Sequence, residues 1–160
     1  MRDWIYGGAS VLGGFLIFAL LRPLSGPLDL VVDVFSVAVL LFGTLRGEIP
    51  GAVFGAVCGL IVDAYSLGVF GLSGLTLTAG GFLAGFVSRK INILVFYRTF
   101  LFFLVLSAGT FAAWAGLVGL VGRSPLPWSG GLILLRPAVT ALAAALIHEA
   151  LRRFKARHER

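Results

Sequence analysis

The feature that most constrains this chain is an uncharged run in its second half. Between Thr99 and Gly122 there is no Asp, Glu, Lys or Arg. This run exceeds the roughly 20 residues that a helix needs to cross the hydrocarbon core of a bilayer. The rest of the chain agrees, because 59% of its 160 residues are hydrophobic and only 12% are charged, whereas about a quarter of the residues of a soluble domain are charged. The sequence therefore predicts an all-α, integral membrane protein.

Charged residues and Pro/Gly clusters divide the chain into six apolar segments. We expect one transmembrane helix from each segment, because a helix satisfies its own backbone hydrogen bonds in lipid. The approximate bounds are 4–21, 28–45, 49–63, 70–88, 98–122 and 132–151, and a basic tail covers 152–160. No stretch between the segments is long enough to fold separately, so residues 1–160 are predicted to form a single domain.

The distribution of basic residues predicts the orientation of these six helices. With the N-terminus inside, ten of the 13 Lys and Arg residues fall on the cytoplasmic side and three fall outside. The cytoplasmic ones are Arg2, Arg46, Arg89, Lys90, Arg98, Arg152, Arg153, Lys155, Arg157 and Arg160, and the outer ones are Arg22, Arg123 and Arg136. Cytoplasmic loops of membrane proteins carry such an excess of Lys and Arg. We therefore expect both termini in the cytoplasm.

Small residues recur at four-residue intervals in the third and fourth segments. Gly51, Gly55 and Gly59 form one stripe, and Gly81 and Gly85 form another. Four residues is slightly more than one helical turn, so each set lines one helix face and lets another backbone approach closely. The stripes pack either against helices of this chain, which we favour, or against a helix of a partner.

Charged side chains on the predicted outer side have two interpretations. Arg22, Asp29, Asp33 and Arg136 form a candidate outer charge cluster, in which the two acids lie one helical turn apart. The acids either form a proton or cation site, or Asp29 faces water and Asp33 pairs with one of the arginines. We favour pairing, because charges at membrane depth are usually paired. Asp63 is expected to accept hydrogen bonds from the backbone amides that directly follow it.

Residue patterns that support catalysis or metal binding are absent from the sequence. There is no HExxH, CxxC, GxSxG or GxxxxGK[ST] motif, and Cys58 is the only cysteine. We therefore expect no enzyme activity, no cofactor and no metal site. The basic tail over 152–160 predicts attraction to anionic lipids. Nucleic-acid binding is not expected, because the surplus of basic residues follows from membrane topology.

The middle of the chain carries a characteristic order of residues. A glycine-bearing helix ends in Asp63-Ala64-Tyr65-Ser66, and the chain restarts at Gly71-Leu72. The sequence Gly81-Phe82-Leu83-Ala84-Gly85, the basic pair Arg89-Lys90 and then Arg98 complete the pattern. This order, over residues 55–98, resembles the MreD family of bacterial rod shape-determining proteins. The length and the six apolar segments agree with that family along the rest of the chain.

The resemblance implies a non-enzymatic scaffold of the cell-elongation machinery, which synthesises peptidoglycan at the bacterial cytoplasmic membrane and sets rod shape. Its direct partner would be MreC, which has one transmembrane helix. MreB, RodA and the elongation penicillin-binding transpeptidase would belong to the same complex. The partner's helix would lie in a groove of small residues. The residues assigned to partner binding are Gly55, Gly59, Asp63, Ser66, Gly71, Gly81, Gly85 and Arg89.

Two alternatives to the scaffold remain at this point. The family fold resembles the six-helix substrate-capture subunits of energy-coupling-factor vitamin importers, which need an outward cavity lined by several polar groups. The other alternative is a proton-linked carrier of a small molecule, and its function would depend on Asp33.

Overall fold

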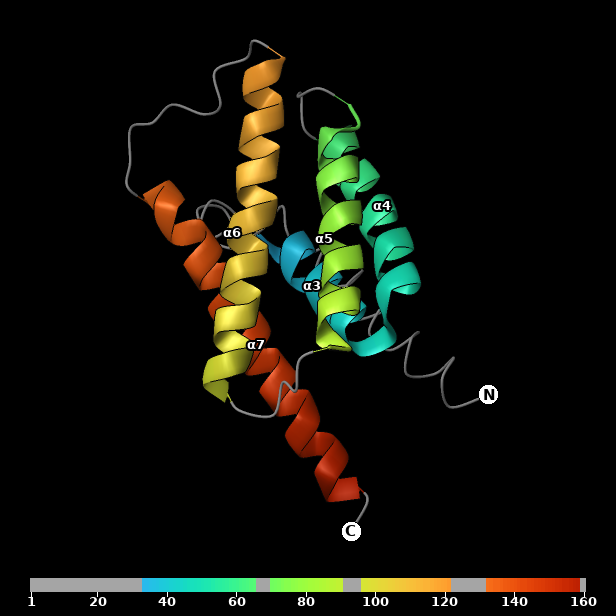
Figure 1. Cartoon of the computed structure of the whole chain (residues 1–160), viewed down its shortest axis with the longest axis vertical. Helices are drawn as coiled ribbons and strands as arrows, with labels where there is room; N and C mark the ends of the chain where they lie inside the picture. The colour runs from blue at the N-terminus through green and yellow to red at the C-terminus, as the bar shows by residue number, and fades with distance from the viewer. Residues whose placement is uncertain (1–32, 66–69, 91–95, 122–131, 159–160) are drawn as a thin grey trace.

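The computed structural model of the chain describes residues 33–65, 70–90, 96–121 and 132–158, which form five α-helices and no strand. The helices are α3 (Val34–Arg46), α4 (Glu48–Tyr65), α5 (Leu72–Ser88), α6 (Phe96–Leu120) and α7 (Leu132–His158) (Figure 1). The predicted all-α class is confirmed for this part of the chain. The helix predicted over 4–21 and the start of the one predicted at 28 lie outside it.

Helices α3, α4 and α5 follow one another up and down and pack closely together (Figure 1). The chain reverses between α3 and α4 at one residue, Gly47, whose φ of 100° favours glycine. The Gly47 amide donates to the Gly43 carbonyl at 2.8 Å, which closes the last turn of α3. Pro50 lies in the first turn of α4, where a backbone N–H has no partner within the helix. The sharp turn allows α4 to return directly alongside α3.

Helix α7 crosses α6 at a tilt and also contacts α3 (Figure 1). The core between them combines large and small side chains. Phe103 of α6 and Leu40 of α3 are almost completely buried, and they pack with Ala141, Ala144 and Ala145 of α7. The alanines let the α7 backbone approach closely, so the bulk at this contact comes from α3 and α6.

The alternating direction of the helices sorts the charged residues by end. In the described ranges, one end of the helix bundle holds eight basic residues, Arg46, Arg89, Lys90, Arg98, Arg152, Arg153, Lys155 and Arg157. Of the acids in these ranges, Glu48 and Glu149 lie at that end, and the other end holds Arg136 with Asp33 and Asp63. The end that holds these basic residues is called the basic end below.

One helix of the described part, α6, is long and apolar enough to cross a membrane, and α3 and α5 are shorter apolar helices. Only 17% of an apolar stretch of 18 residues in α6 is buried. The core helix of a soluble protein would be mostly covered, and α6 differs from such a helix in its exposure.

The helix bounds differ from the sequence prediction mainly at the C-terminus. Helix α7 continues to His158, so residues 152–158, predicted as a basic tail after a helix that ends near 151, are helical as well. The end of α7 passes beyond the ends of α5 and α6 (Figure 1). The fourth predicted segment, 70–88, starts later as a helix, because Gly71 precedes α5 with a φ of 99°.

Candidate functional site

The glycine stripes of α4 and α5 face each other. A Cβ added at Gly51 would overlap the Gly81 carbonyl, and one added at Gly81 would overlap the Gly51 carbonyl. A Cβ at Gly59 would lie 2.5 Å from the Ser73 carbonyl oxygen. In each of these cases the obstacle is backbone, which cannot rotate away as a side chain can. The two helices are therefore in direct backbone contact along their length.

The partner groove predicted along Gly55, Gly59, Gly81 and Gly85 is consequently occupied by the chain itself. A Cβ at Gly55 would overlap the Leu77 backbone, and one at Gly85 would overlap Gly47 and Glu48. A partner's helix cannot reach a face that is already covered at this distance. In the structure these glycines pack within the chain, the alternative that we favoured, and their assignment to partner binding stays a prediction.

Asp63 connects the end of α4 to the start of α5. Its carboxylate accepts hydrogen bonds from the backbone amides of Gly71 at 2.9 Å, Ser73 at 3.1 Å and Gly74 at 3.0 Å. Asp63 is only 5% exposed. The first amides of a helix have no partner within that helix and carry partial positive charge, so a carboxylate stabilises them. Asp63 thus caps a helix other than its own.

The described part of this role reaches farther along the chain than the sequence predicted. The expected donors were the amides that directly follow Asp63, of which those of residues 66–69 lie outside the described residues, and the donors that the structure describes lie 8 to 11 positions later. Gly71, also assigned to partner binding, supplies one of these amides and the left-handed backbone at which α5 starts. Ser66 lies outside the described residues.

The last residue assigned to partner binding, Arg89, forms an ion pair. Its Nη1 lies 3.1 Å from Glu48 Oε1, and the Arg89 side chain is 62% exposed. The pair joins the end of α5 to the start of α4, opposite to the Asp63 cap. Both ends of the α4–α5 pair are therefore tied by polar contacts, while glycines fill its middle.

Part of the outer charge cluster comes together as expected. Asp33 Oδ2 lies 3.9 Å from Arg136 Nη2, an arrangement that agrees with the pairing interpretation of Asp33. Asp33 also accepts from the Ser36 amide at 3.2 Å and the Ser36 hydroxyl at 2.8 Å, as an N-cap does. Its own amide donates to Thr140 Oγ1 at 3.4 Å. Arg22 and Asp29 lie outside the described residues.

Sequence reasoning missed two polar contributions. Thr140, 1% exposed on α7, holds the start of α3, but an isolated threonine in an apolar segment gives no signal of this role. The sequence analysis assigned no role to Glu48, although its position after a one-residue turn places it beside Arg89. Within the described ranges, no three His, Cys, Asp or Glu side chains come together in a way that can hold a metal ion.

Two polar groups of the motif, Asp63 and Arg89, therefore fix α4 against α5 at opposite ends of the helix pair. The hydroxyls of Thr76 and Thr78 instead donate to carbonyls within α5, and that of Ser88 donates to the Thr44 carbonyl of α3. Such a unit can present a rigid surface. No family model, curated protein or solved structure matches this chain.

Proposed function

We propose that the chain is a multi-pass protein of the bacterial cytoplasmic membrane, with the basic end in the cytoplasm. Large apolar side chains on the outer faces of the helices support this. Ile49 and Val53 on α4 are 71% and 61% exposed, Val105 on α6 is 65% exposed, and Leu146 on α7 is 54% exposed. Exposed apolar surface on several helices is stable in lipid and costly in water. The excess of basic residues at one end supports the orientation.

Cysteine labelling tests this orientation on a single helix. Tyr97 and Leu120 are 69% and 85% exposed at opposite ends of α6, and Cys58 can be removed as Cys58→Ser. We expect a membrane-impermeant maleimide to label Leu120→Cys in intact cells, and to label Tyr97→Cys only after permeabilisation. Equal labelling of both positions in intact cells would contradict a spanning α6, and the reverse pattern would invert the topology.

Within that membrane, the proposed function is a non-enzymatic scaffold of the cell-elongation complex, with MreC as direct partner. The resemblance over residues 55–98 suggests this role, and one structural observation gives it the strongest support. The motif residues that the structure describes build a rigid helix pair, in which Asp63, Gly81 and Arg89 are each committed to contacts within the chain. A scaffold needs such a fixed surface, whereas a carrier or an enzyme needs polar groups that remain available.

The partner's helix must then pack on an outward face and not in the glycine groove. Co-purification from native membranes in mild detergent tests this with three bulky substitutions, Val53→Trp, Val105→Trp and Leu146→Trp. Each side chain is more than half exposed, so the fold is expected to tolerate tryptophan there. We expect wild-type protein to retain a partner with a single transmembrane helix, and one of the variants to lose most of it at unchanged thermal stability.

The two other substitutions serve as matched controls for the one that acts. Mass spectrometry could instead show that wild-type protein retains no protein partner but carries a vitamin-sized molecule. That result would favour the substrate-capture subunit over the scaffold. Asp33, on which the carrier alternative depended, is occupied by its contacts with Ser36 and Arg136.

A further inference from the structure

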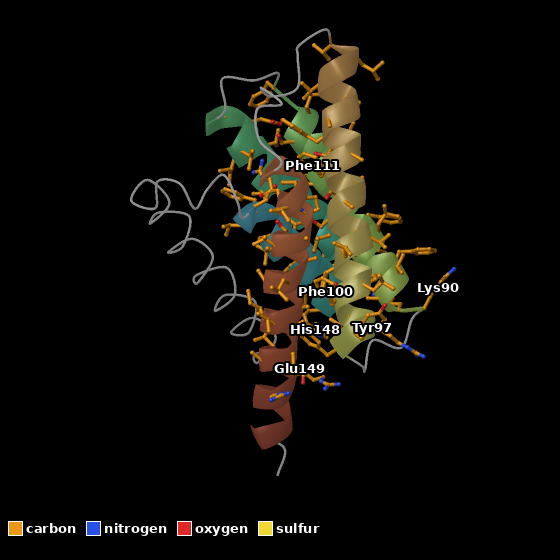
Figure 2. All side chains as sticks on the ribbon, turned by 90° about the vertical axis from the view of Figure 1, so that its left-hand side faces the viewer. Lys90, Tyr97, Phe100, Phe111, His148 and Glu149 are labelled. Carbon is orange, nitrogen blue, oxygen red and sulfur yellow. The ribbon has the colours of Figure 1, made fainter. Side chains whose placement is uncertain are left out.

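The outer face of α5 near the basic end carries two aromatic rings and a cation in line. Phe82 and Phe86 are one turn apart and stacked, with ring centroids 6.0 Å apart, and both are about two-fifths exposed. Lys90 follows one turn later, and its Nζ lies 4.4 Å from the centroid of the Phe86 ring. Figure 2 shows the Lys90 side chain standing off the ribbon, away from α7. These three residues are called the α5 strip.

The direction of the Lys90 side chain is informative. Helix α5 ends at Ser88, and Phe86 precedes that end, so the ammonium group turns back toward the apolar part of the helix. It rests on a ring face, which attracts a cation. The positive charge therefore lies at the border between the apolar outer face of α5 and the basic end, instead of extending into water beyond the helix.

The acidic residues that the structure describes at this end are already engaged by other cations. Glu48 pairs with Arg89, and Glu149 pairs with Arg152 and Arg153 at 3.0 and 2.9 Å. Within the described ranges, Lys90 makes no ion pair with a carboxylate. The charge of Lys90 is consequently available to an external anion, and the exposed rings beside it are available to an apolar chain.

We propose that the α5 strip binds an anionic phospholipid. An acyl chain lies along Phe82 and Phe86, and a phosphate oxygen accepts a hydrogen bond from the Lys90 ammonium. A phospholipid is the occupant whose apolar and anionic parts join at the border where Lys90 lies, and basic residues at the cytoplasmic surface attract anionic lipids. This inference rests on the proposed membrane location.

The test compares purified wild-type protein with Lys90→Gln, Lys90→Arg and Arg153→Gln. Arg153 is 79% exposed at the same end, so its substitution removes an equal charge away from the strip. Native mass spectrometry counts bound dioleoylphosphatidylglycerol against dioleoylphosphatidylcholine after titration in mild detergent. We expect wild type, Lys90→Arg and Arg153→Gln to prefer phosphatidylglycerol, and Lys90→Gln to lose this preference about fivefold, the scale of one basic group at an anionic surface.

An unchanged preference in Lys90→Gln would overturn the proposal, and so would an equal loss in Arg153→Gln, which would indicate diffuse attraction to the whole basic end. A carbonate wash of the membranes separates this result from the location on which it rests. If wild-type protein leaves the membrane on washing, the proposed location fails. If all four proteins stay and their lipid preferences are equal, only the α5 strip fails.

Discussion

Replacing Asp63 by alanine is expected to lower the free energy of unfolding by about 3 kcal/mol or more. The substitution leaves the amides of Gly71, Ser73 and Gly74 without their acceptor, and the last two hydrogen bonds are buried. Each buried donor that loses its partner costs about 1–3 kcal/mol. Unfolding of the purified protein by SDS in mixed micelles measures the loss, and faster hydrogen exchange at these amides would locate it at the start of α5.

Two further variants make this result specific. Asp63→Asn keeps one acceptor oxygen but brings an N–H₂ group toward three donors, so we expect an intermediate loss. Glu48→Gln is the matched control, because its partner Arg89 is mostly exposed and such ion pairs contribute about 0–1 kcal/mol. If Asp63→Ala were no less stable than Glu48→Gln, the carboxylate would not hold the two helices together.

Asp63 also shows how far the sequence could predict this site. An acid at the end of an apolar segment indicates that a carboxylate will accept backbone hydrogen bonds, and that much was predicted correctly. The identity of the donors depends on where the next helix starts and on how closely it returns. That return is set by the contact between Gly59 and Gly74, which is a tertiary property. Local rules for turns therefore could not predict the donors at Gly71, Ser73 and Gly74.

The glycine stripes illustrate a different limit. Four-residue spacing predicts a flat helix face, but it does not say which surface covers that face. The third and fourth segments are neighbours in sequence, and their short connection makes each the nearest available cover for the other. For the outer charges, the sequence offered two arginines for Asp33, and the crossing of α7 over α3 brings Arg136 to it.

The end of the bundle at which each charged residue lies was the easiest feature to predict, because it depends only on the direction of the helix. Antiparallel neighbours alternate their ends, so residues such as Arg46, Lys90 and Arg98 gather once the order of helices is correct. The continuation of α7 to His158 was harder to predict from the sequence. A run of basic residues ends an apolar segment without ending a helix, since Lys and Arg are good helix formers.

Adding a single methyl group at Gly59 is expected to destabilise the protein by about 1–3 kcal/mol, the usual cost of overpacking a close contact. The new Cβ would lie 2.5 Å from the Ser73 carbonyl oxygen, so one helix must move. Gly59→Leu is expected to prevent folding of the α4–α5 pair altogether. Thermal unfolding in mild detergent measures the first effect, and the yield of monodisperse protein measures the second.

Gly116→Ala on α6 is the matched control, because nothing lies within 4 Å of a Cβ at that position. Alanine is the better helix former by up to about 1 kcal/mol, so this variant is expected to be as stable as wild type or more stable. Equal behaviour of the two alanine variants would mean that the glycines of α4 are not in contact with α5.

The comparison also decides how partner binding can be studied. Leucine at Gly81 would abolish co-purification by separating the helices, whatever surface the partner uses, so only variants that retain wild-type stability can locate that surface.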